Sequence, residues 1–249
     1  MREVDVVVLG LGPGGRDAAS QLARAGLDVV GIDERLVGGE CPFFGCTPTK
    51  MMVRAAELLA ESRRVPGLAG TSDVRPDWSR VAARVAGEAT HAWTDDAEVA
   101  ELTGSGVTFV RGHGRLGGPR TVVVGDGRER FVARRGVVLA TGTRPSVPPV
   151  DGLAQVPYWT NRDVVGLTTL PESLAVIGGG SIGAELCQVF ARFGVAVTLL
   201  EAEDRILSAS EPEASALLAT TFADEAIQVL TGREITGVDC VGDRFEISL

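Results

Sequence analysis

The sequence predicts an α/β fold in which one structural unit occurs twice. Each unit reads as a buried strand, a glycine-rich turn, a helix and a second strand that ends at an acidic residue. The first turn spans residues 10–15 and the second spans residues 178–183, which is 168 residues further on (178 − 10). Strand, glycine turn, helix, strand and acid is the layout of a Rossmann dinucleotide site. We therefore expect two Rossmann-like domains, residues 1–150 and 151–249.

The composition limits the class of protein. The chain has 249 residues and is 45% hydrophobic, enough for one large domain or two modest ones. Its net charge of −9 argues against nucleic acid as a partner, because phosphate binding needs clustered basic side chains. No apolar run reaches the length of about 18 residues that predicts a membrane span. The N-terminus leads straight into an apolar strand instead of a signal peptide, so we expect a cytoplasmic protein.

The first unit begins with a strand over residues 4–9 and continues through the glycine turn into a helix. Gly26 ends this helix, and a strand over residues 28–32 precedes Asp33. The glycines let the backbone approach a pyrophosphate, and the helix N-terminus faces its negative charge. The acid accepts hydrogen bonds from ribose hydroxyls. Spacing to the glycines leaves open whether Asp33 or Glu34 does so.

Two cysteines, Cys41 and Cys46, lie five residues apart after a glycine pair at 38–39. Five helical residues rise about 7.5 Å, and a disulfide needs Cα atoms about 4.4–6.8 Å apart. A bridge therefore requires a tightened, non-helical turn. Thr47 can cap the helix that follows, with Pro48 at its first position. Cys46 then lies at the positive end of a helix dipole, which favours the thiolate of a redox-active pair.

A zinc site and a structural disulfide are the alternatives for this pair. Zinc needs further ligands at suitable spacing, and Cys187, Cys240, His91 and His113 form no such pattern. A structural disulfide is disfavoured because nothing in the sequence suggests export. Cys187 follows the second glycine turn and reads as a small buried hydrophobe. His91 reads as a surface or packing residue.

The middle of the chain reads as two helices followed by short strands. The helices are expected at residues 51–64 and 77–102, with a loop over 66–76. The strands are expected at residues 107–110, 121–124, 131–132 and 136–140. Prolines at 145, 148 and 149 predict an extended, stiff linker, and we place the domain boundary there.

The second unit repeats the layout of the first. A strand over 174–177, the glycine turn, a helix and a strand over 195–200 lead to Glu201 in the acid position. Beyond it we expect a helix over 213–223 and strands around 229, 235–240 and 245–249. Gly242 and Asp243 read as a hairpin turn between the last two strands.

The segment from Gly38 to Lys50 resembles the active-site segment of the FAD-dependent pyridine nucleotide–disulfide oxidoreductases. This family includes lipoamide dehydrogenase, glutathione reductase and mercuric reductase. Its pattern of two glycines, Cys-x4-Cys and then Pro-Ser/Thr-Lys is met position by position. The resemblance implies FAD on the first domain, a nicotinamide cofactor on the second, and a small antiparallel β-meander. It also implies Asp33 as the ribose-binding carboxylate, because that residue lies eight positions before the first cysteine.

The resemblance further implies that electrons pass between NAD(P)H, FAD, the Cys41–Cys46 disulfide and a small disulfide or dithiol substrate. Cys46 would be the flavin-facing thiolate, and Cys41 the outer thiol that meets the substrate. Lys50, the only lysine in the chain, would lie near the flavin and pair with Glu185 beside the nicotinamide.

The implied catalytic residues are Cys41, Cys46, Lys50 and Glu185. The residues expected to bind FAD are Gly10, Gly12, Pro13, Gly14, Gly15, Asp33, Glu34, Gly39, Cys41, Lys50, Gly114, Thr141 and Gly142. The residues expected to bind the nicotinamide cofactor are Gly178, Gly180, Ser181, Ile182, Gly183, Glu185 and Glu201. No metal is expected. A carboxylate at 201 favours NADH, because it would repel the 2′-phosphate of NADPH, although Arg205 lies close in sequence.

Three functions remain open. The first is a disulfide oxidoreductase of lipoamide dehydrogenase type. The second is the same chemistry on another substrate, as in mercuric reductase, which Phe43 and Phe44 between the cysteines keep open. The third is a truncated nucleotide-binding module without turnover. The chain matches about half of the family pattern and lacks its C-terminal dimerisation domain, which carries a His-x4-Glu acid–base pair. We therefore expect a homodimer at full length, and this chain alone to be incomplete for turnover.

Overall fold

The computed structural model describes residues 1–242 and 244–249. Contacts between residues divide the chain into two compact units. The first unit comprises Met1–Pro48 and Ala86–Arg144, and the second comprises Thr49–Val85 and Pro145–Leu249. Each unit is therefore built from two separate stretches of sequence. A domain boundary near residue 150 remains a prediction. Within the described part of the chain, no helix combines the length and the apolar character needed to cross a bilayer.

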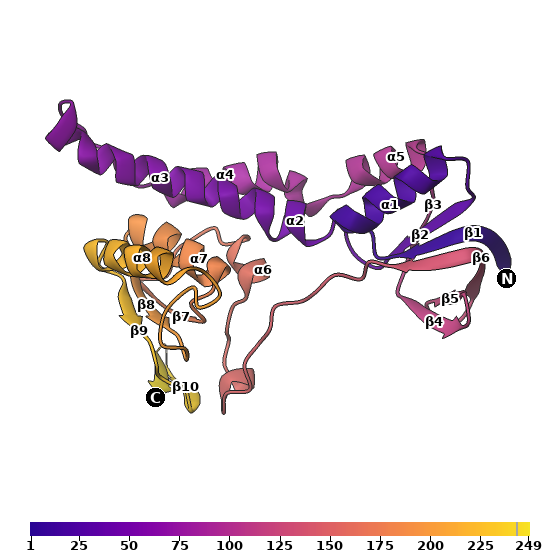
Figure 1. The fold of residues 1–249 in the computed structure, drawn as a ribbon. Coiled ribbons are helices and arrows are strands. Elements are labelled where there is room, and N and C mark those ends of the chain that lie inside the picture. The colour runs from indigo at the N-terminus through magenta and orange to yellow at the C-terminus, as the bar shows by residue number, and fades with distance from the viewer. Residues whose placement is uncertain (243) are drawn as a thin grey trace. The chain divides into compact units, whose positions relative to one another are not determined.

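The first unit is a six-stranded sheet with the order β3-β2-β1-β6-β5-β4 (Figure 1). β1 (Arg2–Leu9) lies between β2 (Val29–Asp33) and β6 (Glu129–Leu139) and is parallel to both. β3 (Thr108–Arg111) extends the parallel part beside β2. β4 (Gly114–Gly118) and β5 (Thr121–Val124) complete the sheet as an antiparallel meander with β6.

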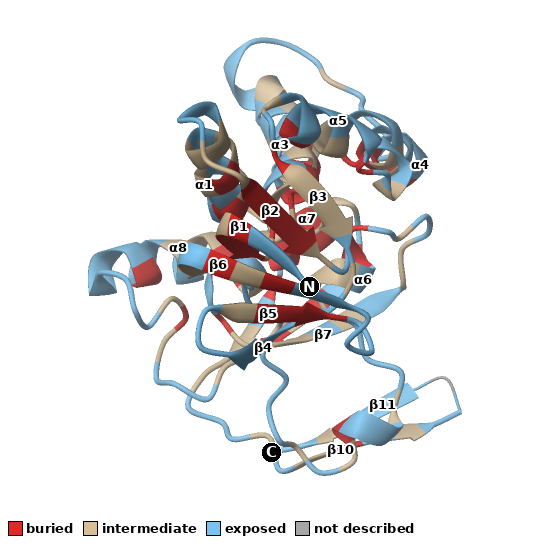
Figure 2. Cartoon of the chain, turned by 90° about the vertical axis from the view of Figure 1, so that its right-hand side faces the viewer, coloured by how far each residue is buried: buried red, intermediate tan, exposed pale blue. Residues whose placement is uncertain are grey.

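Alternate residues of β1 pack against opposite faces of this sheet. Val6 and Val8 lie in the cluster formed with α1 (Pro13–Arg24) and α5 (Asp96–Gly104). Val7 and Leu9 lie in the cluster on the other face, together with residues of β5 and β6. Burial on both faces is typical of a central parallel strand, and Figure 2 shows β1, β2 and β5 largely in the buried colour. The carboxyl ends of β1 and β2 are therefore held rigidly.

The strand predictions for the first unit need two corrections. β6 is one strand of eleven residues, where the sequence predicts separate strands at 131–132 and 136–140. It pairs with β1 along almost its whole length and with β5 along its first part. β3, predicted among the short strands, belongs to the parallel layer, with Asp33 opposite Arg111. The meander is thus continuous with the parallel sheet.

The helix predictions also need correction. α3 (Cys46–Leu68) runs through Pro66, where the sequence predicts a loop. The proline lies in the last turn of this helix, and the helix ends two residues beyond it. The single helix predicted over 77–102 is broken into four pieces. These are α4 (Trp78–Arg84), a π-helical turn (Val85–Ala89), a 3₁₀ turn (His91–Trp93) and α5.

The second unit contains a three-stranded parallel sheet with the order β7-β8-β9. Its strands are β7 (Ser173–Ile177), β8 (Ala196–Leu200) and β9 (Gln228–Leu230). Its helices include α6 (Asn161–Val164), α7 (Ser181–Arg192) and α8 (Pro212–Asp224), with a 3₁₀ turn at Leu153–Gln155. β10 (Gly237–Val241) and β11 (Arg244–Ser248) pair antiparallel. Gly242 follows β10, and Asp243 of the predicted hairpin turn lies outside the described residues.

Candidate redox and nucleotide-binding sites

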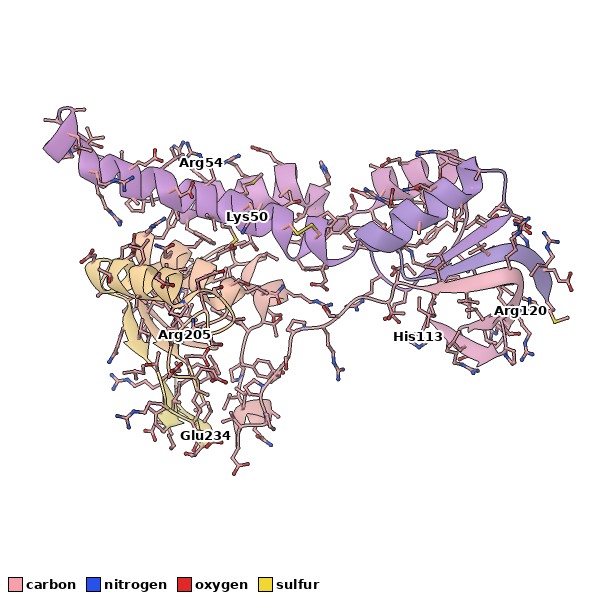
Figure 3. The ribbon with its side chains drawn as sticks, viewed as in Figure 1. Lys50, Arg54, His113, Arg120, Arg205 and Glu234 are labelled. Carbon is pink, nitrogen blue, oxygen red and sulfur yellow. A yellow bond between two sulfur atoms is a disulfide. The ribbon has the colours of Figure 1, made fainter. Side chains whose placement is uncertain are left out.

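The two cysteines of the first unit form a disulfide, drawn in yellow in Figure 3. Cys41 lies in α2 (Glu40–Phe43), and Cys46 is the first residue of α3. Their Cα atoms are 4.6 Å apart, within the usual range for a disulfide. The predicted non-helical turn is present at Phe44 and Gly45, between α2 and α3. The predicted cap is wrong, because Thr47 lies inside α3. The sulfur of Cys46 belongs to the N-terminal residue of a long helix, where a thiolate is favoured.

The glycine pair before the cysteines lies against the first glycine turn. Gly38 and Gly39 have φ values of +110° and +67°, in the region that favours glycine. A Cβ on Gly39 would lie 2.9 Å from the Cα of Gly12, so a larger residue would push the segments apart. The N–H of Gly38 donates to the carbonyl of Leu11 at 2.8 Å. The redox segment is therefore fixed to the turn that begins α1.

A strained turn contacts the loop between the cysteines. His91, Ala92 and Trp93 have φ values of 48°, 55° and 55°. Left-handed backbone costs roughly 1–2 kcal/mol for each residue other than glycine. The indole N–H of Trp93 donates to the carbonyl of Phe43 at 3.2 Å. This carbonyl lies between the two cysteines, in the last turn of α2, where no partner within the helix is available to it.

A buried carboxylate binds the backbone just before the glycine pair. Asp95 is 7% exposed, and its carboxylate accepts a hydrogen bond from the N–H of Val37 at 2.6 Å. It also accepts one from the guanidinium of Arg111 at 2.6 Å. A buried carboxylate with both a cation and a backbone donor has its charge compensated. Trp93 and Asp95 are not predicted as site residues, because both fall within a stretch whose apolar spacing predicts a plain helix.

A cavity of about 300 Å³ opens at the carboxyl ends of β1 and β2 in the first unit. The predicted FAD residues among those that line it are Gly10, Gly12, Pro13, Asp33, Glu34, Gly39, Gly114, Thr141 and Gly142. Gly14, Gly15, Cys41 and Lys50 are not among its lining residues. A Cβ on Gly15 would lie 2.0 Å from the carbonyl oxygen of Gly10. This glycine therefore lets α1 pack closely on the strand end.

Two neighbouring acids at the end of β2 have different partners. The carboxylate of Asp33 accepts hydrogen bonds from the N–H of Leu11 at 2.7 Å and from the N–H of Arg35 at 2.9 Å. It thus holds the glycine turn in shape. Glu34 lies beside the ring of His113, with 2.7 Å between its carboxylate oxygen and Nδ1. Both acids line the cavity, so either side chain can reach a ligand there.

The second glycine turn has the same geometry as the first. The N–H of Gly178 donates to the carbonyl of Leu200 at 2.8 Å, and the N–H of Gly179 donates to the carboxylate of Glu201 at 2.6 Å. A Cβ on Gly183 would lie 2.1 Å from the oxygen of Gly178. Each of these contacts has a counterpart between the residues 168 positions earlier. The repeat predicted from the sequence is therefore a repeat of hydrogen bonds and of close glycine contacts.

The remaining predicted nicotinamide residues lie at the start of α7. Gly180 is the N-cap of this helix, and Ser181 and Ile182 begin its first turn. The side chain of Ile182 is exposed. The free N–H groups of a first turn can bind a negatively charged phosphate. This turn is therefore suited to a pyrophosphate.

Lys50 and Glu185 form a hydrogen-bonded ion pair within the second unit. Lys50 extends from α3 and Glu185 from α7; Figure 3 labels the lysine. Their side chains are 62% and 36% exposed, and such pairs contribute only about 0–1 kcal/mol to stability. The structure thus brings together the two residues that the resemblance paired. Their contacts with cofactors stay predictions.

The other two cysteines have separate environments. Cys187 is fully buried in α7, and this burial raises the pKa of its thiol to about 12. Such a thiol is unreactive near neutral pH, which fits the expected packing role. Cys240 lies in β10 and its sulfur donates to the carbonyl of Gly242 at 3.4 Å. Among residues 1–242 and 244–249, no cluster of three or more His, Cys, Asp and Glu side chains could hold a metal ion.

A profile of the pyridine nucleotide-disulphide oxidoreductase family matches residues 4–248. The mercuric reductase of Acidithiobacillus ferrooxidans is 33% identical over 254 residues, which cover 99% of this chain and 46% of that protein. The dihydrolipoyl dehydrogenase of Acholeplasma laidlawii is 30% identical over 244 residues, covering 96% of this chain and 71% of that one.

A solved structure agrees in fold. The Cu(II) complex of the HOCl-induced flavoprotein disulfide reductase RclA from Escherichia coli matches with a TM-score of 0.85 and 24% sequence identity. The match covers 100% of this chain and 54% of that chain. The chain thus spans about half the length of RclA and of the mercuric reductase.

Two Rossmann-like units and a disulfide beside the first glycine turn define a class of dinucleotide-dependent disulfide oxidoreductases. The chain belongs to the pyridine nucleotide-disulphide oxidoreductase family, whose members are FAD-dependent enzymes. The predicted α/β fold with two Rossmann-like units and the predicted family are confirmed.

Proposed function

We propose that this chain is the nucleotide-binding portion of an FAD-dependent NAD(P)H:disulfide oxidoreductase. Electrons pass between a nicotinamide cofactor, FAD and the Cys41–Cys46 disulfide. This proposal rests on the position of the disulfide. It joins α2 to the first residue of α3, on a segment bonded to the glycine turn of a Rossmann unit.

The residues of the first unit fit FAD. A Cβ on Gly12 or on Gly142 would meet no atom within 4 Å, and both residues line the cavity. Their backbone is thus open to a ligand at the N-terminus of α1, where a pyrophosphate is favoured. Asp33 and Glu34 supply carboxylates for ribose hydroxyls. When bound, the flavin carries an electron pair between the nicotinamide and the disulfide.

The cysteines then perform thiol–disulfide exchange. Opening their bond takes up two electrons; Cys41 takes a proton, and Cys46 remains a thiolate at the N-terminus of α3. Cys41, once deprotonated, attacks a disulfide substrate and forms a mixed disulfide, and one substrate thiolate leaves. Cys46 then attacks the sulfur of Cys41, which releases the second thiolate and restores the intramolecular disulfide.

The proposal is tested by labelling the full-length, FAD-loaded protein with iodoacetamide before and after addition of NADH. We expect NADH to make Cys41 and Cys46 reactive, because the electron pair opens their bond. Omission of NADH is the control. The proposed function is wrong if NADH is oxidised without either cysteine becoming reactive. Peptide mass spectrometry identifies the labelled residues.

The nicotinamide cofactor is proposed to be NADH. Glu201 ends β8 in the acid position, and a carboxylate there accepts ribose hydroxyls and repels a 2′-phosphate. The guanidinium of Arg205 donates to the carbonyls of Leu207, Ser208 and Ser210 at 2.6–3.0 Å. These bonds hold Arg205 within its own loop, so it offers less to a phosphate than its place in the sequence suggests.

We expect NADH to bind at least about fivefold more tightly than NADPH, because repulsion of unit charges at 4 Å costs about 1 kcal/mol even in water. Titration calorimetry with both cofactors measures the ratio. Glu201→Gln should lower the ratio of the two affinities, since its amide oxygen can still accept a hydrogen bond from the N–H of Gly179 but carries no charge. Tighter binding of NADPH by the unchanged protein would overturn the assignment.

The substrate is proposed to be a small disulfide or dithiol, with dihydrolipoamide first. Mercuric reductase chemistry is the second candidate, favoured by the 33% identity to the mercuric reductase of Acidithiobacillus ferrooxidans. The aromatic pair between the cysteines keeps this candidate open. Phe43 is buried and Phe44 lines the cavity. We further propose that the full-length protein acts as a cytoplasmic homodimer, as the family resemblance implies.

A further inference from the structure

We infer that Trp93 is a positioning residue of the redox disulfide and sets how readily the bond between Cys41 and Cys46 opens. This inference rests on the proposed function, because it concerns the same disulfide. Its basis is the hydrogen bond from the indole N–H of Trp93 to the carbonyl of Phe43, at 3.2 Å. That carbonyl belongs to the loop closed by the two cysteines, and Trp93 is not part of the loop.

The contact is held on both sides by the fold. On the tryptophan side, the backbone N–H of Trp93 donates to the carbonyl of Thr90 at 2.8 Å, and Thr90 is fully buried. The turn of left-handed residues His91–Trp93 fixes the direction of the indole. On the loop side, Phe43 is 1% exposed. A Cβ on Gly38 would lie 3.2 Å from this ring, so its position leaves little free space.

The residues just beyond this turn bind the backbone that precedes the loop. Two residues beyond Trp93, the buried carboxylate of Asp95 holds the N–H of Val37 at 2.6 Å. One short segment therefore contacts the redox segment twice, once before Cys41 and once between the cysteines. Backbone strain persists only where surrounding contacts fix it, and it gathers at functional sites. These two contacts indicate that the strained turn and the residues after it position the redox segment.

The chemical consequence concerns the equilibrium between disulfide and dithiol. Opening the bond takes up two electrons and one proton and gives the thiol of Cys41 and the thiolate of Cys46; a second proton released by the reductant goes to solvent. With dithiothreitol as the donor, the electrons and both protons come from its two thiols, which close to a cyclic disulfide. A loop held in place by Trp93 keeps the two sulfurs close after reduction, which favours closing. Loss of the N–H donor frees the loop, so the disulfide should be reduced more readily.

The test measures this equilibrium in the full chain. The protein is equilibrated with mixtures of reduced and oxidised dithiothreitol, trapped with iodoacetamide, and the fraction of reduced Cys41 and Cys46 is read by mass spectrometry. We expect Trp93→Phe to shift the midpoint about fivefold toward reduction, the size of one hydrogen bond. Replacement of Trp93 by 3-benzothienylalanine keeps the ring shape without the N–H, so it should shift the midpoint equally while preserving the packing.

Trp78→Phe is the matched control. The indole N–H of Trp78 also donates to a backbone carbonyl, that of Leu167, at 2.8 Å, but this bond lies in the second unit. Trp78→Phe should lower the stability and leave the redox midpoint unchanged. An unchanged midpoint in the benzothienylalanine protein, or an equal shift in Trp78→Phe, overturns the role of Trp93 and leaves the proposed function standing. A disulfide that fails to open and close reversibly in the unchanged protein overturns both.

Discussion

Cys41→Ser and Cys46→Ser should each abolish NADH-linked disulfide reduction by the full-length protein. Each replacement removes one of two sulfurs that act as a unit. Loss of a residue that forms the covalent bond typically lowers the rate by about three orders of magnitude or more. Steady-state reduction of a small disulfide by NADH measures the effect. Both variants should still bind FAD, because neither sulfur lines the cavity of the first unit.

The two variants should differ in their absorption spectra. In Cys41→Ser, Cys46 remains as a free thiolate at the N-terminus of α3. A thiolate against a flavin gives a long-wavelength charge-transfer band, so this variant should show the band without any reductant. Cys46→Ser should lack the band, while Cys41 stays open to alkylation by iodoacetamide.

Cys240→Ser is the control for both variants, because this cysteine lies in the antiparallel pair β10–β11 of the second unit. It should retain activity. Full activity of Cys41→Ser or Cys46→Ser would contradict the redox role of the pair. Absence of the band in flavin-loaded Cys41→Ser would contradict the separate roles of the two sulfurs.

Gly15→Ala should destabilise the first unit and weaken FAD binding. The added Cβ would lie 2.0 Å from the carbonyl oxygen of Gly10 and 3.0 Å from the Cβ of Ala140. Backbone cannot yield as a flexible side chain can, so α1 must move away from the strand ends. Overpacking of this kind costs about 1–3 kcal/mol. Urea unfolding measures the loss of stability, and fluorescence titration with FAD measures the loss of affinity.

Gly14→Ala provides a control one residue away on the same helix. A Cβ at this position would meet no atom within 4 Å, and alanine is the better helix former by up to about 1 kcal/mol. This variant should therefore be as stable as the unchanged protein or slightly more so. If Gly14→Ala and Gly15→Ala lost equal stability, close packing of α1 against the glycine turn would not explain the effect.

Much of both nucleotide turns could be predicted from the sequence. From Gly10 to Asp33 and from Gly178 to Glu201 the spacing is identical, and the structure repeats the hydrogen bonds at that spacing. At Gly10, Gly15 and Gly183 glycine specifies the geometry directly, because a Cβ there would lie 2.0–2.2 Å from a backbone carbonyl oxygen. The cysteine pair could be predicted for a similar reason, since its spacing and its neighbours restrict the possible chemistry.

The contacts of Trp93 and Asp95 with the redox segment could not be predicted in this way. Trp93 and Phe43 are fifty residues apart, and no periodic pattern relates the two. The apolar spacing over 77–102 favours one helix, whereas His91, Ala92 and Trp93 turn to the left-handed region because tertiary contacts override local preference. The partners of Asp95, Val37 and Arg111, are brought to its carboxylate only by the fold.

The long strand β6 has a consequence for the order in which the first unit folds. It pairs with β1 in a register that joins Arg2 to Phe131, across 129 positions of sequence (131 − 2). During synthesis, β1 and β2 therefore emerge long before the strand that completes their sheet. Pairings between distant segments form slowly, because the chain must close a large loop first. Until β6 is made, the apolar edge of β1 stays open to other chains.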